Sequence, residues 1–409
     1  QDGNWQEEST SFLSVLRKTQ KKYNAPKLSD IPHFTGGLVG FMGYESITWV
    51  EDIPIYKQDE LQCPDALFML FHELIAFDHL QNQIILFSNV QIENGMDLEQ
   101  AYTDANLCID EMGEDLHTDI DYQTPARLEQ SKLHSNFTQA KFEDAVQKAK
   151  ENIKAGDVFQ LVLSQCFRRQ TSVDPLTMYR ALRSINPSPY MFHLKLNDFD
   201  IIGASPELLV KVEDDEIEIR PIAGTRQRGE NAEADKLLAD DLLKDEKERA
   251  EHLMLVDLGR NDVGRAAEFD SVNVKEFMVV EYYSHVMHIV SDVRGKLREG
   301  KDVFDALYSG FPAGTLTGAP KIRAMEIIHD LEPSRRGVYS GAIGYFDFTG
   351  DMNTCIAIRT MVMKDGTVYF QSGAGIVYDS DPKKEFEETV NKAKAINSAI
   401  DLAENGLVD

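Results

Sequence analysis

The sequence has 409 residues, of which 42% are hydrophobic and 27% are charged, a composition typical of globular proteins with sizeable cores. Its formal net charge of −27 repels phosphate backbones and disfavours nucleic acid as a partner. No apolar run approaches the roughly 18 residues of a membrane helix, and no secretion signal opens the chain. The four cysteines lie far apart and form no CxxC pair and no zinc-binding spacing, which suits a reducing cytoplasm. Because the chain begins at Gln1 rather than Met, we expect its natural start to lie upstream.

The first part of the chain, residues 1–135, predicts short strands and connections that form an N-terminal domain. The predicted elements are a tight strand pair over Phe34–Tyr44, neighbouring strands over Leu67–Phe77 and Gln83–Val90, and an exposed helix and loop over Glu93–Gln123. The polar residues 124–135 predict a linker, so we place a domain boundary at residue 135.

From residue 136 onward the signals are stronger. Thr138 can cap a helix that has apolar residues at helical spacing and ends at Gly156. Further helices are predicted over Pro175–Ile185, 231–260, 302–308, 319–331 and 382–404. Strands are predicted over Val158–Phe167, 272–280, 285–292, 340–348, 353–363 and 367–377, with a meander between Tyr190 and Pro221. This mixture indicates an α+β architecture with large antiparallel sheets across a second domain, residues 136–409.

Two of the predicted helices each carry a Glu-x-x-Glu pair. Glu248 and Glu251 share one helix face, and Glu385 and Glu388 share another together with Lys392. A single pair of this kind is typical of a solvated helix face. If the two helices converge, however, the four carboxylates form an oxygen-rich site for Mg²⁺, which binds one or two carboxylates together with waters and substrate oxygens.

Other segments suit an anionic ligand. The glycine-rich run Gly314–Lys321 lacks the spacing of a phosphate-binding loop, but its free N–H groups ahead of a helix suit a carboxylate. The strand residues 373–375 let backbone approach a ligand, although glycines in a strand also mark bulges. Arg359 follows an apolar strand and would pair with a substrate carboxylate if buried. A strand histidine such as His288 is more often structural.

Together these motifs resemble the chorismate-utilising enzymes. The matching motifs are SPE (205–207), PIAGTRQRG (221–229), EHLMLVDLGRND (251–262), SHVMH (284–288), PAGTLTGAPK (312–321) and EETVNKA (387–393). Residues 136–409 are similar to the chorismate-binding catalytic domain. Residues 1–135 more weakly resemble the N-terminal region of anthranilate synthase large subunits, without its opening segment. The resemblance implies two large antiparallel sheets packed together with helices outside, an α/β/β/α arrangement.

Two positions discriminate between branches of this family. Members that use water as nucleophile carry a lysine in place of Gln160, and a desolvated lysine can serve as the base that water needs. Gln160 cannot accept a proton, which implies ammonia as the nucleophile. Aminodeoxychorismate synthases carry a nucleophilic lysine in place of Ala223.

The resemblance therefore implies a large subunit of anthranilate synthase, a lyase of tryptophan biosynthesis that converts chorismate and ammonia to anthranilate and pyruvate. The alternatives are aminodeoxychorismate synthase of the folate branch and a non-catalytic paralogue that senses an aromatic metabolite.

The resemblance also implies a metal site and a general acid. Glu251 and Glu388 are expected to ligate Mg²⁺ directly, and Glu248 and Glu385 through water, so that the metal holds the ring carboxylate of chorismate. Glu207 is expected to protonate the departing C4 hydroxyl while ammonia adds at C2. Such an acid needs a raised pKa, which burial near other carboxylates supplies.

The remaining implied residues bind substrate or assist the second half of the reaction. Those expected to contact chorismate are Gly224, Thr225, Tyr339, Arg359, Lys392 and the backbone of Gly373, Ala374 and Gly375. Thr225 and Lys392 also count among the catalytic residues, Lys392 by adding positive charge near the metal. His288 and Thr315 are expected to assist loss of pyruvate and aromatisation.

A partner and a regulator follow from the same resemblance. Free ammonia is mostly ammonium at neutral pH, so a glutamine amidotransferase subunit (component II) is expected to generate it in place. The segment Pro189, Tyr190 and Met191 resembles the tryptophan feedback site of such enzymes. Relatives complete that site with an N-terminal Leu-Leu-Glu-Ser segment that these 409 residues do not contain.

Overall fold

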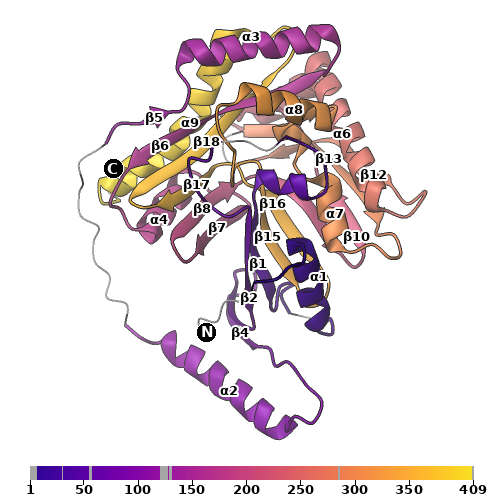
Figure 1. The fold of residues 1–409 in the computed structure, drawn as a ribbon, viewed down its shortest axis with the longest axis vertical. Helices are drawn as coiled ribbons and strands as arrows, with labels where there is room; N and C mark the ends of the chain where they lie inside the picture. Colours follow the sequence, from indigo (N-terminus) through magenta and orange to yellow (C-terminus); the bar gives the residue numbers. More distant parts are fainter. Residues whose placement is uncertain are drawn as a thin grey trace.

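The computed structural model describes residues 7–29, 31–54, 58–119, 128, 131–283 and 286–407. Within these ranges the strands form a nine-stranded sheet, a seven-stranded sheet and a two-stranded hairpin, all antiparallel (Figure 1). The predicted α+β class with large antiparallel sheets is confirmed. None of the helices in these ranges is both long and apolar enough to cross a membrane.

The nine-stranded sheet takes strands from both ends of the chain. Its order is β11 (Ile222–Gln227), β13 (Val286–Lys296), β10 (Glu216–Ile219), β9 (Leu208–Glu213), β16 (Met352–Ile356), β15 (Ala342–Asp347), β1 (Gly37–Met42) and β2 (Ala66–Phe71), with β12 (Asn273–Tyr282) paired to β13. Strands β1 and β2 thus extend a sheet built mostly from residues beyond 200. The proposed boundary at residue 135 stays a prediction, since half of the predicted linker lies outside the described residues.

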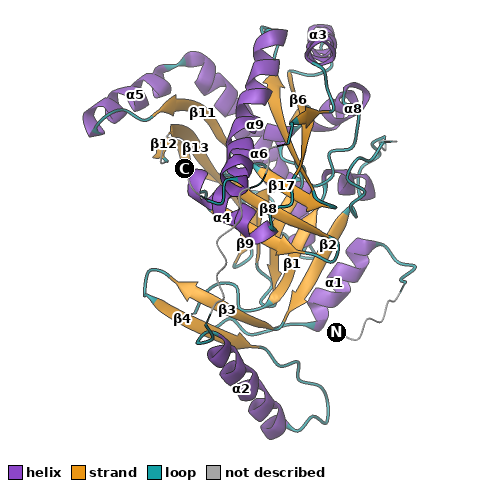
Figure 2. Ribbon diagram, turned by 90° about the vertical axis from the view of Figure 1, so that its left-hand side faces the viewer, coloured by secondary structure: helices purple, strands orange, loops and turns teal. Residues whose placement is uncertain are grey.

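The seven-stranded sheet lies entirely after residue 133. Its order is β14 (Gly318–Ala319), β6 (Gln160–Gln170), β18 (Thr367–Ile376), β17 (Thr360–Lys364), β8 (Phe199–Ser205) and β7 (Tyr190–Lys195), with β5 (His134–Ser135) paired to β6. The hairpin β3 (Glu73–Asp78) and β4 (Gln83–Ser88) carries helix α2 (Leu98–Asp115) at one end of the molecule (Figure 2).

The two sheets pack face to face, and helices cover their outer faces. Phe41 and Ile343 of the first sheet share one buried cluster with Ile201 and Val362 of the second. Helices α6 (Glu246–Ala266) and α7 (Val303–Gly310) pack on the nine-stranded sheet, and α4 (Pro175–Ile185) and α9 (Pro382–Glu404) on the seven-stranded sheet. The α/β/β/α arrangement is therefore confirmed. The remaining helices are α1 (Phe12–Lys22), α3 (Gln139–Ala155), α5 (Ala232–Lys244) and α8 (Lys321–Leu331), with short 3-10 helices η1 (Tyr44–Trp49) and η2 (Gly314–Leu316).

Several elements agree closely with the sequence pattern. Helix α3 begins after Thr138, whose side chain accepts from the Lys141 N–H, and ends at Gly156 in the left-handed conformation. Helix α4 occupies the predicted residues. The predicted helix over 231–260 is instead two helices, because Asp245 ends α5 and caps the first turn of α6. Helix α1 and strand β11 were not predicted.

The strand pair predicted over Phe34–Tyr44 is wrong. This segment forms the single strand β1, whose neighbours β15 and β2 come from distant residues. Its glycines permit close approach rather than a turn: a Cβ atom at Gly40 would lie 2.0 Å from the Leu67 carbonyl oxygen. The predicted strand Leu67–Phe77 likewise splits into β2 and β3, which belong to different sheets.

The predicted meander between Tyr190 and Pro221 is also wrong. Strands β7 and β8 pair with each other, as do β9 and β10, but β8 and β9 lie in opposite sheets. The chain crosses between sheets at Pro206 and Glu207. The predicted strand 353–363 makes the reverse crossing, from β16 to β17, at residues 357–359.

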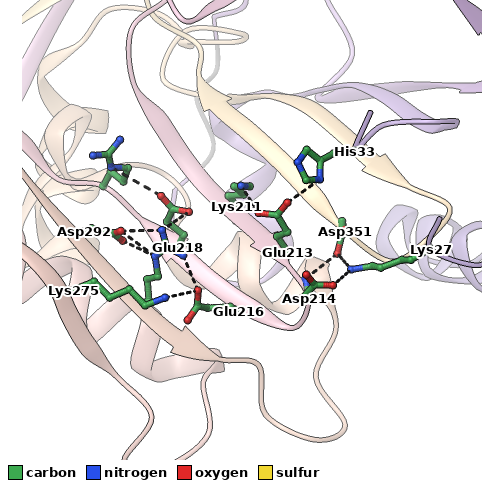
Figure 3. Close-up of polar contacts among 12 residues, drawn as sticks. Lys27, His33, Lys211, Glu213, Asp214, Glu216, Glu218, Lys275, Asp292 and Asp351 are labelled. Atoms are coloured by element: carbon green, nitrogen blue, oxygen red, sulfur yellow. Dashed lines mark hydrogen bonds and ion pairs between the residues drawn. The ribbon is translucent and has the colours of Figure 1, made fainter. Parts of the chain in front are cut away.

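Charged side chains tether the N-terminal segment to the β9–β10 hairpin (Figure 3). The Lys27 ammonium lies 2.5 Å from an Asp214 carboxylate oxygen and 2.9 Å from one of Asp351. His33 reaches Glu213 at 2.8 Å on the same edge. These contacts are largely exposed, so each contributes little stability alone.

Candidate active site

The two sheet crossings lie side by side and bring Glu207 and Arg359 together. The Ser205 hydroxyl donates to the Ile356 carbonyl oxygen at 2.7 Å, and the Ile356 N–H donates to the Glu207 carbonyl oxygen at 3.0 Å. The Ala204 N–H donates to the Arg359 carbonyl oxygen at 3.0 Å. These bonds fix the backbone of both crossings where the chain leaves regular pairing.

Glu207 has the electrostatic character of a general acid. Burial raises the pKa of its carboxyl group to about 7, against the lowering effects of a Thr315 hydrogen bond and the charges of Arg359 and Lys392. The Thr315 hydroxyl donates to Glu207 Oε1 at 3.0 Å. A carboxyl group with a pKa near 7 is substantially protonated at neutral pH and can deliver a proton.

Arg359 presents a guanidinium to the same space. Its backbone lies in the left-handed region at φ 49°, which turns the chain from one sheet to the other. Burial lowers the pKa of Arg359, while the Glu207 carboxylate raises it. The guanidinium makes a long 3.5 Å contact with the Asn186 amide oxygen, which leaves it available to an anionic ligand.

Strand β18 and helix α9 form another wall. Lys392 Nζ donates to the Gly373 carbonyl oxygen at 3.0 Å and lies 2.8 Å from Glu388 Oε1. A Cβ atom on Gly373 would lie 3.0 Å from the Tyr339 hydroxyl, and one on Gly375 would lie 3.3 Å from Gln160 Nε2. The face of β18 that carries Gly373 and Gly375 therefore lies against Tyr339 and Gln160, while Ala374 is buried on the opposite face.

His288 on β13 is joined to the neighbouring strand β11. Its Nδ1 lies 3.0 Å from the Gly224 carbonyl oxygen and 3.1 Å from the Thr225 hydroxyl. The carbonyl can only accept, so Nδ1 carries the hydrogen and Nε2 holds the lone pair. Burial lowers the pKa of His288, and the Arg359 charge lowers it further. A neutral imidazole in this tautomer can accept a proton at Nε2.

The four predicted metal ligands come from two helices, α6 and α9. Burial raises the pKa of Glu251, and the charges of Glu248 on its own helix and Glu388 on α9 raise it further. Burial likewise raises the pKa of Glu385, and the Glu388 charge adds to it. The carboxylates of the two helices therefore repel one another across one space.

This donor set suits a magnesium ion, although it is not drawn tightly together. Among the described residues, no group of three or more His, Cys, Asp or Glu side chains is arranged to hold a metal. Glu248 instead pairs with Arg226 at 3.2 Å, and Glu388 pairs with Lys392. Mutually repelling carboxylate oxygens are nevertheless the hard ligands that Mg²⁺ selects, with substrate and water completing its shell.

The segment Pro189, Tyr190 and Met191 lies outside this cluster, at the start of the edge strand β7. Burial raises the pKa of the Tyr190 phenol, as do the charges of Cys355 and Glu218 in the other sheet. The segment thus lies against the nine-stranded sheet. Its loop touches the site through Asn186 and Arg359.

Three polar residues near the site were not predicted from the sequence to be site residues. Burial raises the pKa of the Tyr283 phenol to about 12, with contributions from the Glu281 carboxylate and, to a smaller extent, from the charge of Glu207. Lys321 and Asp262 form a buried ion pair of 2.9 Å, and Asp262 lines a hollow beside Glu207 and Thr315. Lys321 and Asp262 both lie within the sequence motifs shared with chorismate-utilising enzymes, but only the fold brings them together. Ser284 and His285 of the SHVMH motif lie outside the described residues.

Comparisons with known proteins show the family to which the chain belongs. Residues 2–398 match the family of chorismate binding enzymes. Anthranilate synthase component 1 of Aquifex aeolicus is 48% identical over 97% of this chain and 81% of its own length. A crystal structure of anthranilate synthase component I from Streptococcus pneumoniae is 40% identical with a TM-score of 0.86, over 96% of this chain and 86% of that one.

A more distant structure shows the shared fold alone. The menaquinone-specific isochorismate synthase MenF of Escherichia coli is 18% identical, with a TM-score of 0.70 over 95% of this chain and 82% of its own. The full-length family match and the high identity to component 1 proteins decide the assignment. The chain belongs to the chorismate-binding enzyme family and, within it, to the anthranilate synthase component 1 proteins.

Proposed function

We propose that this chain is the chorismate-converting subunit of an anthranilate synthase, which forms anthranilate and pyruvate from chorismate and ammonia. One observation favours this reaction over others in the family: Gln160 stands beside Gly375, at the β18 wall of the site. An amide cannot take a proton from water, so this position favours ammonia, whose lone pair attacks without prior deprotonation by a base. Ala223 likewise offers no nucleophile for a covalent intermediate.

The first half of the reaction uses the acid at the sheet crossing. Arg359 and the β18 backbone hold the carboxylates of chorismate, with Tyr339 beside them. The ammonia lone pair attacks C2, both double bonds of the ring shift by one position, the C4–O bond breaks, and the new ammonium group loses a proton to solvent. Glu207 gives its proton to the departing hydroxyl, which leaves as water.

The second half uses the neutral imidazole. Nε2 of His288 takes the proton from the ring carbon that bears the new amine, while the bond to the enolpyruvyl oxygen breaks. The ring becomes aromatic, and the enolate that leaves takes up a proton at its methylene carbon to become pyruvate. Thr225 and the Gly224 carbonyl keep His288 in the tautomer that this step requires.

The carboxylates of α6 and α9 would hold Mg²⁺, Glu251 and Glu388 directly and Glu248 and Glu385 through water. The bound ion would neutralise the ring carboxylate of chorismate and fix its position. Lys392 adds a further positive charge at Glu388. Local cations are needed because the net charge of −27 repels an anionic substrate at longer range.

Ammonia would come from a glutamine amidotransferase subunit, and the complex would work in the cytoplasm. Tryptophan is the proposed inhibitor. Pro189, Tyr190 and Met191 would contact it, and the 3.5 Å approach of Asn186 to Arg359 would connect this segment with the substrate site.

The deciding experiment incubates the chain with chorismate, MgCl₂ and an ammonium salt at alkaline pH. The expected products are fluorescent anthranilate and an equal amount of pyruvate. An amino product that keeps its enolpyruvyl group would assign the chain to aminodeoxychorismate synthesis instead. No turnover at any ammonia concentration would favour a sensing paralogue.

A further inference from the structure

Arg336, just after α8, is fully buried and uses every donor of its guanidinium within the protein. Its Nε and Nη2 donate to Glu332 at 2.9 and 2.7 Å. The remaining donors reach the carbonyl oxygens of Val162 and Leu316, at 2.8 and 2.7 Å, and the Ser340 hydroxyl at 3.2 Å. A guanidinium has five N–H donors, so none is left for a substrate.

Three of these partners, Leu316, Val162 and Ser340, lie within two residues of a residue of the proposed active site. Leu316 directly follows Thr315, the donor to Glu207. Val162 lies on β6 two residues after Gln160. The guanidinium also lies over the Tyr339 ring, 5.6 Å from its centroid. The Arg336 side chain therefore links the backbone segments that carry Thr315, Gln160 and Tyr339.

The N-terminal part of the chain holds Arg336 in place. Glu45 of η1 is 4% exposed and accepts the backbone N–H groups of Arg336 at 2.8 Å and Gly337 at 3.0 Å. The Tyr44 ring lies under the guanidinium, 4.8 Å from centroid to Cζ. A short N-terminal helix thus fixes the backbone from which Arg336 reaches the catalytic loop.

We propose that Arg336 is a positioning residue that holds Thr315 against Glu207, and that Glu45 anchors it. The inference rests on the proposed role of Glu207 as general acid. Without the guanidinium, the Leu316 carbonyl loses its anchor and the Thr315 hydroxyl no longer stays within bonding distance of Glu207. The other charged or titratable groups near Glu207 are Arg359, Lys392 and Tyr283, together with Arg220 and Asp262, which line the same hollow. Arg336 bonds to none of them.

The consequence is a shift in pH dependence. The Thr315 bond favours the ionised form of Glu207 and lowers its pKa. Losing the bond raises that pKa, so Glu207 stays protonated to higher pH. We measure kcat/KM for chorismate against pH at constant free ammonia. The descending limb of this profile is expected to shift to higher pH by about one unit, which corresponds to losing one hydrogen bond to a charged group.

The test compares Arg336→Lys, Thr315→Val and the double variant. Lysine keeps the charge but not the planar fork. Arg336→Lys and Thr315→Val are each expected to shift the descending limb of the kcat/KM profile to higher pH. The double variant is expected to shift it no further than Thr315→Val alone. The matched control is Arg169→Lys, which alters a buried arginine paired with Asp401 and Glu404. It should lower stability without moving the limb.

Two outcomes would overturn the inference: an unshifted limb in Arg336→Lys, or additive shifts in the double variant. If Arg336→Lys does not fold, Glu45→Gln replaces it, with a smaller upward shift that is absent in the Thr315→Val background. An unmoved limb in Glu45→Gln then overturns the inference. If the descending limb of kcat/KM in Glu207→Gln is the same as in the wild type, Glu207 is not the general acid, and the inference about Arg336 fails with that assignment.

Discussion

At the scale of single residues, Glu207 is the side chain on which the proposed reaction most depends. Replacing it with glutamine keeps the shape and removes the transferable proton. We expect kcat for anthranilate formation to fall by roughly 10²- to 10⁴-fold. Glu213→Gln, at the far end of β9, is the matched control and should retain activity. Activity within a fewfold of wild type in Glu207→Gln would exclude Glu207 as the acid.

The pKa of about 7 for Glu207 also predicts a pH dependence. Only the protonated form can act as an acid, and its fraction falls as pH rises through the pKa. At constant free ammonia, kcat/KM for chorismate should therefore decline roughly tenfold per pH unit above about pH 7. Initial rates across pH 6 to 9 check this. A profile that stays flat through pH 9 would contradict it.

His288 predicts a different signature, because it is proposed to act after amination. His288→Ala should slow anthranilate release and allow an aminated intermediate that still carries the enolpyruvyl group to accumulate. Chromatography with mass spectrometry detects that species. His193→Ala, which changes a histidine paired with Asp200 on β8, should leave the product ratio unchanged. Normal anthranilate output without the intermediate would remove His288 from this step.

At the scale of elements, two helices from distant parts of the chain face each other with their carboxylates. The charge of Glu388 on α9 contributes to the raised pKa of Glu251 on α6, so the two Glu-x-x-Glu pairs lie near each other in the fold. Neither helix alone brings two pairs together. The two sheet crossings act similarly, because each delivers one charged side chain to the opening between the sheets.

This convergence predicts how magnesium dependence responds to mutation. Glu251→Gln and Glu388→Gln should each raise the Mg²⁺ concentration for half-maximal activity by roughly tenfold or more, since losing even an outer-shell partner has effects of that size. Removing metal with EDTA should abolish activity, and MgCl₂ should restore it. Asp257→Asn, on the exposed face of α6, is the control. An unchanged magnesium requirement in both glutamate variants would place the metal elsewhere.

At the scale of the whole molecule, residues before 135 contribute to the core between the sheets. Phe41 on β1 is 1% exposed and meets Phe199 of the other sheet, with ring centroids 6.1 Å apart. Phe41→Ala should lower the free energy of unfolding by roughly 3 to 5 kcal/mol. Phe77→Ala, at a position 57% exposed on the hairpin, should change it by less than about 0.5 kcal/mol.

Denaturant unfolding followed by tryptophan fluorescence and circular dichroism measures both variants. Equal stabilities for the two would mean that the N-terminal strands add nothing to the common core. The contacts of Glu45 with the Arg336 backbone suggest the same integration near the active site.

The sequence alone determined much of the local structure and the family. Capping and periodicity located α3 between Thr138 and Gly156, because these signals depend on neighbouring residues only. The motif resemblance agreed with the family comparison. Gln160 predicted ammonia as the nucleophile and Ala223 predicted anthranilate as the product, since chemistry that a side chain lacks is visible without a structure.

The tertiary structure alone decided how distant segments meet. A strand that changes sheets keeps the same alternation as one that does not, so Glu207 and Arg359 could not be placed at crossings from periodicity. Convergence of α6 with α9, and the burial that raises the pKa of Glu207, depend on packing between segments far apart in sequence. Arg336 shows this most clearly, because the groups that its guanidinium contacts come from four separate elements and turns, which only the fold brings together.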